Sequence, residues 1–261
     1  MKRYGWLIAL GLLALLGFVL ATLPASVASG QLGRIGVQTA SLDGSFWNGT
    51  ATGVAWRGAS LGNAEWTIAP AALLRGRVVG RIQLLRQDGN LATDFSASLS
   101  GKALQLTGAT LELPIEVLST LPLGMSRGWQ GRVSGRFDEV HVTGGWPAAL
   151  RGELDLDGLV APSPRNAEVG SYHAVFPHPR PQASAVTGAA LDPTAITAQV
   201  ADTGGPFSVE GQLTIGRDRS FLLEGVLAPR GPVPPAMERS LQLLGPADAS
   251  GRRPFSVGGT L

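Results

Sequence analysis

The sequence predicts a mainly β protein, in which a single N-terminal transmembrane helix precedes a curved antiparallel β-sheet of meander or roll form with two or three short helices. Three observations lead to this prediction. A long apolar run lies near the N-terminus, apolar and polar residues alternate in many later segments, and 36 glycines and 18 prolines are spread over the 261 residues. Because glycine and proline interrupt helices and shape turns, their abundance favours short strands.

The first predicted element is a transmembrane helix at residues 4–23, between a cytoplasmic N-terminus (residues 1–3) and a short tether (residues 24–36). Twenty helical residues span about 30 Å, the thickness of the hydrocarbon layer. No charged residue occurs between Arg3 and Arg34. Lys2 and Arg3 place the N-terminus in the cytoplasm by the positive-inside rule. The expected membrane-anchor residues are Tyr4, Trp6, Leu7, Leu10, Leu13, Leu16, Phe18, Leu20 and Leu23.

A cleaved signal peptide is the alternative for this segment. Residues 26–28 (Ser-Val-Ala) have the small-x-small form of a cleavage site. The apolar region of a signal peptide usually runs about 7–15 residues, however, and this one is longer. The sequence therefore favours an uncleaved anchor, and in either case the rest of the chain is exported.

Residues 37–261 are expected to form a periplasmic β-rich domain. Apolar residues alternate with polar ones in segments 91–99, 153–157, 207–213 and 221–227. In segment 132–142 the alternation changes phase between Phe137 and Val140. One wet face and one dry face are typical of an antiparallel sheet.

Helices are expected only as short pieces. Residues 70–74, 114–121 and 235–244 carry apolar residues at helical spacing or a proline that opens a turn. Residues 161–182 are rich in proline and indicate either a long loop or a subdomain boundary.

Large aromatic residues are the candidates for the core of the sheet. Three tryptophans lie among glycines in residues 42–70. An exposed aromatic row could bind sugar or lipid, but burying each ring removes about 150–250 Å² from water, so a core role is favoured. The core candidates are Trp47, Trp56, Trp66, Phe95, Phe137, Phe207 and Phe221.

The sequence carries no pattern that indicates catalysis, a cofactor or a metal. It has no cysteine, no G-x-S-x-G elbow and no phosphate-binding loop. The three histidines, at 141, 173 and 178, lack the spacing of a metal site. Asp155 and Asp157 share a strand face that is expected to meet water, because Leu154 and Leu156 occupy the other face. A non-enzymatic function is therefore expected.

A nucleic-acid partner is not expected either. The net charge is +2, and the 21 basic and 19 acidic residues become equal in number once Lys2 and Arg3 are set aside. Phosphate binding needs a concentrated basic face. The nearest basic group interleaves with apolar residues and is interpreted as solvated strand positions: Arg75, Arg77, Arg81 and Arg86.

Several segments resemble the type II secretion system protein N family. They are the N-terminal run ending in Leu-Pro, "FWNGTATGVAW" from residue 46, "LGNAEWTIAPAALLRGRV" from residue 61, "GRVSGRFDEV" from residue 131, and "LQLLGPADASGRRPFSVGGTL" from residue 241. The resemblance covers residues 1–90, 125–158 and 238–261. It implies a single-pass inner-membrane component with a cytoplasmic N-terminus and a periplasmic β-rich domain. It also implies that the partners are other inner-membrane platform subunits of an apparatus that exports folded proteins across the outer membrane. It supplies no active-site residues.

A second hypothesis is a lipid-binding or lipid-transfer protein. The expected sheet also resembles the elongated, groove-forming domains of AsmA-type proteins, which is a likeness of fold alone. This hypothesis requires a continuous apolar groove on one face of the sheet. Under this hypothesis a lipid is a further partner.

Overall fold

The computed structural model describes residues 22–34, 36–56, 58–120, 128–162, 167–177, 195–231, 241, 244 and 246–260. Within these residues, fourteen strands form one sheet in which every pairing is antiparallel. From β3 to β14 the strands follow one another across the sheet in sequence order, while β1 and β2 both pair with β3. This order is a meander, and it confirms the predicted mainly β class and antiparallel pairing.

The strands grow longer toward the middle of the sheet. They are β1 (Val37–Gln38), β2 (Ser41–Gly44), β3 (Asn48–Trp56), β4 (Ala59–Ala69), β5 (Arg77–Leu85), β6 (Asn90–Ser98), β7 (Ala103–Pro114), β8 (Gln130–Thr143), β9 (Trp146–Val160), β10 (Glu168–Phe176), β11 (Ile196–Gly204), β12 (Phe207–Ile215), β13 (Ser220–Pro229) and β14 (Arg253–Thr260).

The helices of the described residues are short. They are η1 (Ala25–Ala28), α2 (Ser29–Arg34), η2 (Pro70–Arg75) and α3 (Ile115–Thr120). The predicted turn at 70–74 is thereby confirmed, and the short helix predicted at 114–121 is found at Ile115–Thr120, after Pro114 ends β7. Proline opens η2, and Gly76 ends it in the left-handed conformation that a glycine adopts without strain. Residues 25–34, expected as part of the tether, form η1 and α2.

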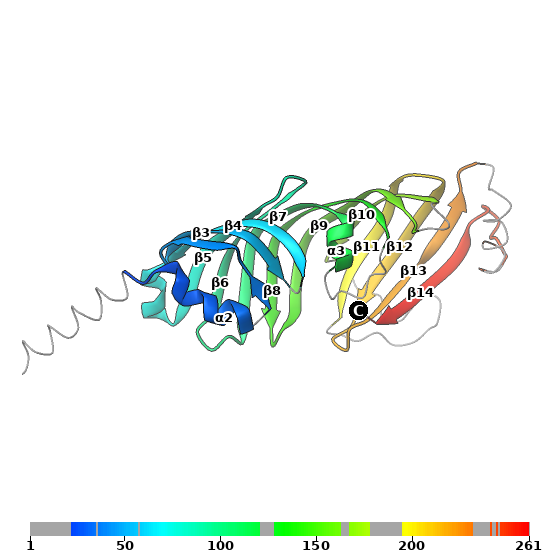
Figure 1. Ribbon diagram of the computed structural model, residues 1–261. Helices are drawn as coiled ribbons and strands as arrows, with labels where there is room; N and C mark the ends of the chain where they lie inside the picture. The colour runs from blue at the N-terminus through cyan, green and yellow to red at the C-terminus, as the bar shows by residue number, and fades with distance from the viewer. Residues whose placement is uncertain are drawn as a thin grey trace, which may run out of the picture.

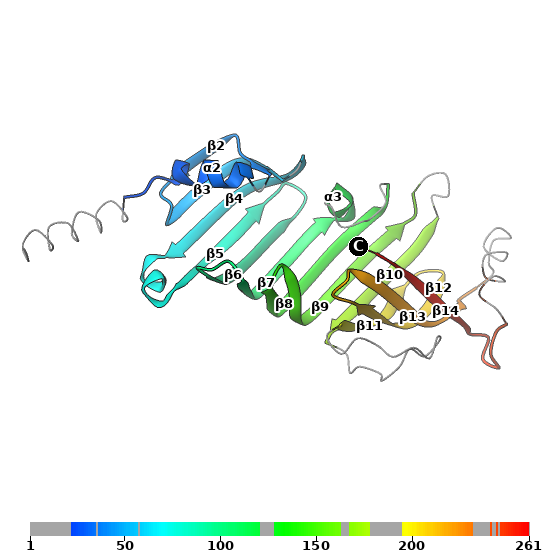
Figure 2. The same ribbon diagram turned by 90° about the horizontal axis from the view of Figure 1, so that it is seen from below.

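The sheet extends along the whole molecule and is strongly curved. Figure 1 shows it running from β3 at one end to β14 at the other. Figure 2 shows that β5 to β10 lie side by side, while β13 and β14 turn out of that layer and cross it at a different angle. Adjacent strands each add a right-handed twist, so a single sheet of this width curls.

One face of the sheet is mainly apolar. A row of register partners crosses it from β4 to β14 without a polar residue: Ala64, Leu84, Leu91, Leu111, Gly135, Leu154, Ala174, Val200, Gly211, Gly225 and Phe255. We call the face that carries this row the apolar face and the opposite one the polar face. Because side chains alternate across a strand, the neighbours of these residues lie on the polar face.

The polar face carries cross-strand ion pairs. Arg81 on β5 pairs with Asp94 on β6, and Arg132 on β8 pairs with Glu112 on β7. These side chains are all about half exposed or more. The division into an ionic face and an apolar face confirms the alternation read from the sequence.

Only small parts of the apolar face are fully buried in the described residues. One buried cluster, with Ala51, Val54 and Ala64, lies on β3 and β4. The other lies on β10 and β11 and contains Ala174, Phe176, Ile196 and Ala198. The largest fully buried side chains are Ile115, which begins α3, and Val133 on β8. Helix α3 contacts β4, β7 and β8, so it covers the middle of the sheet.

The aromatic core candidates mark the apolar side of the structure but are mostly not deeply buried. Trp47 is buried, with 9% of its surface exposed. The other six are half-buried: Trp56, Trp66, Phe95, Phe137, Phe207 and Phe221. A single sheet that the described helices cover only in part leaves such rings partly open on one side.

Part of the expected loop or boundary at residues 161–182 forms β10, which pairs with β9 and β11 in the continuous sheet. Of the expected helix at 235–244, only Leu241 and Leu244 lie among the described residues.

Candidate functional site

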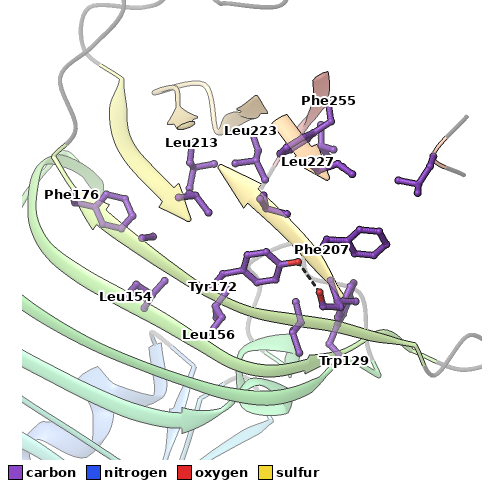
Figure 3. Close-up of a pocket in the computed structure, with 17 residues that line it drawn as sticks. Trp129, Leu154, Leu156, Tyr172, Phe176, Phe207, Leu213, Leu223, Leu227 and Phe255 are labelled. Atoms are coloured by element: carbon purple, nitrogen blue, oxygen red, sulfur yellow. Dashed lines mark hydrogen bonds between the residues drawn. The ribbon is translucent and has the colours of Figure 1, made fainter. Parts of the chain in front are cut away.

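The C-terminal part of the apolar face forms a cavity of about 590 Å³. Strands β9 and β10 supply one wall and β12 to β14 supply the facing wall, because the sheet curls between them (Figure 3). Prominent lining side chains are Leu154, Tyr172, Phe176, Phe207, Leu223 and Phe255. Volumes of roughly 300–1,000 Å³ are typical of small-molecule sites.

A pair of glycines allows the sheet to close around this cavity. Gly211 on β12 and Gly225 on β13 are register partners in the apolar row. A Cβ atom added to Gly225 would lie 2.2 Å from the carbonyl oxygen of Glu210 and 2.6 Å from the Cα of Gly211. A Cβ atom on Gly211 would lie 2.7 Å from the carbonyl oxygen of Glu224. The close approach of the two backbones at this point therefore requires residues without a side chain.

The cavity lining has almost no polar chemistry. None of its residues is charged. The hydroxyl of Tyr172 donates a hydrogen bond of 2.9 Å to the carbonyl oxygen of Val169, so its proton is used within the protein. Buried side-chain atoms without a hydrogen-bond partner in the described residues include those of Ser96, Trp146 and Gln212, and none of these residues lines the cavity. The site can therefore bind by apolar contact and shape, with no acid, base or nucleophile.

Beside the cavity, a buried carboxylate pairs with a half-exposed arginine. The Asp202 side chain, 5% exposed, forms an ion pair with Arg230, and its Oδ1 accepts a 2.7 Å hydrogen bond from the Val209 backbone N–H. Asp202 is the register partner of Tyr172. Desolvation, with a smaller contribution from the Asp202 charge, raises the pKa of the Tyr172 hydroxyl. The phenol therefore stays neutral next to the cavity.

The two described histidines each lie close to carboxylates of neighbouring positions on the polar face. His173 Nδ1 lies 2.6 Å from Asp155 Oδ1, and its Nε2 lies 3.9 Å from Glu153 Oε2. His141 Nε2 lies 2.7 Å from Glu139 Oε1. The part of the chain that the structure describes contains no group of three or more residues that could hold a metal ion.

The remaining candidates of this kind are not brought together. Asp155 and Asp157 lie on β9, where the side chain of Asp155 meets His173 across the strands as a half-exposed pair. His178 lies outside the described residues.

The four arginines 75, 77, 81 and 86 do not form a basic patch. Arg81 donates two hydrogen bonds to Asp94, and Arg86 donates two to Asp88. Arg75 and Arg77 are exposed at the end of η2 and the start of β5. Arg77 and Arg81 are therefore exposed strand positions as expected, whereas Arg75 ends η2 and Arg86, whose side chain is only 18% exposed, follows β5.

Most of the predicted membrane-anchor and orientation residues lie outside the described residues. These are Lys2, Arg3, Tyr4, Trp6, Leu7, Leu10, Leu13, Leu16, Phe18 and Leu20. Within the described part of the chain, no helix is long and apolar enough to cross a membrane. Leu23 is described: its carbonyl oxygen accepts a 2.9 Å hydrogen bond from the Phe46 backbone N–H, and Pro24 forms an isolated β-bridge with Ser45.

Sequence reasoning identified part of the cavity lining but gave it a different role. Phe207, as a core candidate, and Leu154, Leu213, Leu223 and Leu227, by their alternation, were placed on one face, and all of them line the cavity. A further group was missed: Trp129, Tyr172, Phe176, Phe255 and Val257. For β10 a partial signal was present, since Gly170, Tyr172 and Ala174 alternate with the polar residues Ser171 and His173.

Comparison with known proteins places this fold in a family. No solved structure matches the chain. Two curated relatives are each named "Type II secretion system protein N". The one from Vibrio cholerae is 27% identical over 254 residues, which is 93% of each chain. The one from Aeromonas hydrophila is 24% identical over 268 residues and covers both chains completely. The model of the family "Type II secretion system (T2SS), protein N" matches residues 35–256, so the chain belongs to the type II secretion system protein N family.

Proposed function

We propose that this protein is a non-enzymatic component of a type II secretion system, held in the bacterial inner membrane by residues 4–23. The observation that carries the proposal is the family match over residues 35–256, together with two relatives aligned over nearly their whole length and named for secretion. The uncharged run between Arg3 and Arg34 supports the anchor. Residues 1–3 would lie in the cytoplasm, residues 24–36 would connect, and residues 37–261 would work in the periplasm.

The proposed role of the periplasmic part is to hold other platform subunits of the secretion apparatus. A long sheet with an ionic face offers a wide surface for such contacts. Strand β14 pairs with β13 and is the last strand in the sheet order. A partner strand can add to such an edge through backbone hydrogen bonds. We therefore infer that the β14 edge is one contact point for a platform subunit.

Insertion and orientation can be tested with a periplasm-dependent phosphatase fused after residue 36 and after residue 261. Both fusions are expected to be active and to remain in the membrane fraction. Leu13→Arg is expected to release the chain, because an arginine at the centre of a membrane helix costs about 2.5–3.5 kcal/mol. Leu99→Arg is the matched control, because Leu99 is exposed and lies in the sheet domain. Inactive fusions, or a chain that is soluble without Leu13→Arg, would contradict the anchor.

The partner can be tested by site-specific crosslinking, since the chain contains no cysteine. Ser256→Cys places a thiol on exposed β14, and Thr110→Cys places one on the exposed polar face of the central strand β7. Ser256→Cys is expected to capture a platform subunit in membranes and Thr110→Cys much less. Equal capture by both would reject the edge as the contact point. Capture of no secretion subunit by either variant, nor by pull-down of the intact chain, would reject the proposed function.

The lipid-transfer hypothesis is not proposed as the function. The names of both relatives refer to secretion. They therefore support a role in the secretion apparatus and give no support to lipid transfer.

A further inference from the structure

We propose that the cavity between β9–β10 and β12–β14 is a binding site for a single hydrocarbon chain, the acyl chain of a fatty acid or a phospholipid. The site lies on the apolar face; Phe255 and Val257 of β14 turn their side chains to it, whereas the proposed partner contact uses the backbone edge of the same strand. This proposal depends only on the described lining residues. A test of it therefore does not depend on which secretion subunits bind the protein.

The chemistry of the lining selects a purely apolar ligand. A charged ligand group inside the cavity would find no opposite charge, and a hydrogen-bonding group would find few partners, because the lining carries no charge and the Tyr172 hydroxyl already donates its proton to Val169. Burying an unpaired polar group is strongly unfavourable. Small-molecule sites for polar ligands usually present a few well-placed polar groups. Their scarcity here points to a hydrocarbon tail whose head group stays outside.

The size of the cavity favours a chain over a polypeptide segment. An extended peptide would bring backbone N–H and C=O groups into a space that cannot pair them. A helix satisfies its own backbone, but a cylinder about 10 Å wide with a pitch of 5.4 Å occupies roughly 400 Å³ per turn. A cavity of about 590 Å³ would therefore hold little more than one turn. A flexible hydrocarbon chain can fill the same volume along its length.

The walls that would contact the chain are already apolar and partly open. Leu223, with register partners Leu213 and Val257, forms a stripe across β12, β13 and β14. Leu213 and Leu223 are half-buried and Val257 is 52% exposed. Facing them, Leu154 and Phe176 stand on β9 and β10 (Figure 3). A ligand between the walls would remove apolar surface of both from water, which is the main source of affinity at such a site.

The test uses the purified full-length chain with phosphatidylcholine vesicles that carry a photoactivatable probe. One arm uses palmitic acid with a diazirine on its chain, and a second uses phosphatidylethanolamine with the same group on one acyl chain. Mass spectrometry of the digested protein then locates the adducts. We expect them within residues 152–176 and 207–227, and the arm that labels more strongly identifies the source of the chain.

Two variants, each with a matched control, separate the cavity from general contact with lipid. Leu223→Trp fills the cavity, whereas Leu222→Trp places the same ring on the polar face of β13. Val257→Lys puts a charge on the exposed part of the lining, where a lysine need not be buried. Ser256→Lys is its control and puts the same charge on the opposite face. The cavity variants are expected to lower labelling of residues 152–176 and 207–227 by about tenfold, as a lost apolar contact does in a hydrophobic pocket.

The proposal is overturned if neither probe labels these strands above the level of the polar face, including the case in which a polypeptide occupies the cavity. It is also overturned if Leu222→Trp and Ser256→Lys lower the labelling as much as the cavity variants do. Far-ultraviolet circular dichroism and resistance to limited proteolysis establish that each variant is folded. Should Leu223→Trp fail to fold, Val257→Lys and the adduct positions of the unchanged chain still decide the question.

Discussion

Arg81 on β5 and Asp94 on β6 form a two-pronged ion pair across adjacent strands, with Arg81 Nε 2.7 Å from Asp94 Oδ1 and Arg81 Nη2 2.8 Å from Asp94 Oδ2. The pair lies on the polar face and is well exposed. The hydrogen bonds from Arg81 hold the pKa of Asp94 below its ordinary value of 3.8. On the apolar face of the same two strands lie Ile82 and Thr93, which are register partners of each other.

The first prediction concerns the contribution of this ion pair to protein stability at acidic pH. A carboxyl with a lowered folded-state pKa stabilises the protein at pH values above its unfolded pKa, and this contribution disappears as the pH falls through the folded pKa. Arg81→Gln is therefore expected to lower the stability slightly at neutral pH, and the difference from the unchanged protein should vanish in acid below pH 3.8. Urea denaturation followed by tryptophan fluorescence measures it. Because exposed pairs are screened, high salt should also shrink the difference.

A difference that persisted at low pH would show that Arg81 acts by packing and not by its charge. Arg75→Gln is the matched control. Arg75 is also an exposed arginine, at the end of η2, and its replacement should leave the acid dependence unchanged.

The second prediction concerns the contribution of Tyr172 to protein stability at alkaline pH. Burial raises the pKa of its hydroxyl above 10.0, so the folded state keeps a proton that the unfolded chain releases. The stability from this residue is complete below pH 10 and is lost as the pH rises through the folded pKa, with a slope of at most about 1.4 kcal/mol per pH unit. Tyr172→Phe removes the titration and the hydrogen bond to Val169, at a cost of about 1 kcal/mol near neutral pH.

Urea denaturation of both proteins on either side of pH 10 checks this prediction. The advantage of the unchanged protein should shrink above pH 10, and absorbance of the tyrosinate should appear late in its titration. A constant advantage at every pH would contradict a buried, neutral phenol beside Asp202.

The local parts of this fold could be predicted because they depend on short-range pattern. The period-two alternation in residues 207–213 and 221–227 identified the strands and the apolar face of each. The phase change seen between Phe137 and Val140 corresponds to a register shift between Phe137 and Glu139, where β8 pairs irregularly with β9. A bulge inserts an extra residue, so the side chains of the strand change faces after it.

The cavity could not be predicted from the same pattern. Alternation tells which residues share a face but not whether a second layer covers them, so Phe207 was expected in a core and instead lines an open wall. The curl that creates the cavity depends on which glycines become register partners, as Gly211 and Gly225 do. Strand β10 was not predicted, because nearby prolines such as Pro177 and Pro179 favoured a loop. The alternation within β10 itself is short and was outweighed by these prolines.

The third prediction concerns helix α3 as the cover of the central sheet. Ile115 is 2% exposed and is one of the two largest fully buried side chains among the described residues. Ile115→Ala is expected to lower the free energy of unfolding by about 2–5 kcal/mol, because it removes apolar contacts and leaves a void between α3 and the sheet. Glu116→Ala, at the exposed next position, is the control and should cost much less. Equal small effects in chemical denaturation would mean that α3 does not pack on the sheet.

The last prediction concerns the glycine pair that closes the cavity. Gly225→Ala places a methyl group 2.2 Å from the Glu210 carbonyl oxygen unless the backbones of β12 and β13 separate. Overpacking of this kind typically costs about 1–3 kcal/mol. Separation of the two strands would also move Leu223 and Leu227 away from β9 and β10 and widen the cavity.

The matched control is Gly204→Ala at the end of β11, where an added Cβ would meet nothing within 4 Å. Denaturation should show a lower stability for Gly225→Ala alone, and hydrogen exchange should show faster opening of the amides that join β12 to β13. Since Gly225 has no positive φ to relieve, these effects would come from the close approach of the strands. Unchanged exchange in Gly225→Ala would mean that β12 and β13 tolerate a methyl group there, and the curl of the sheet would then need another cause.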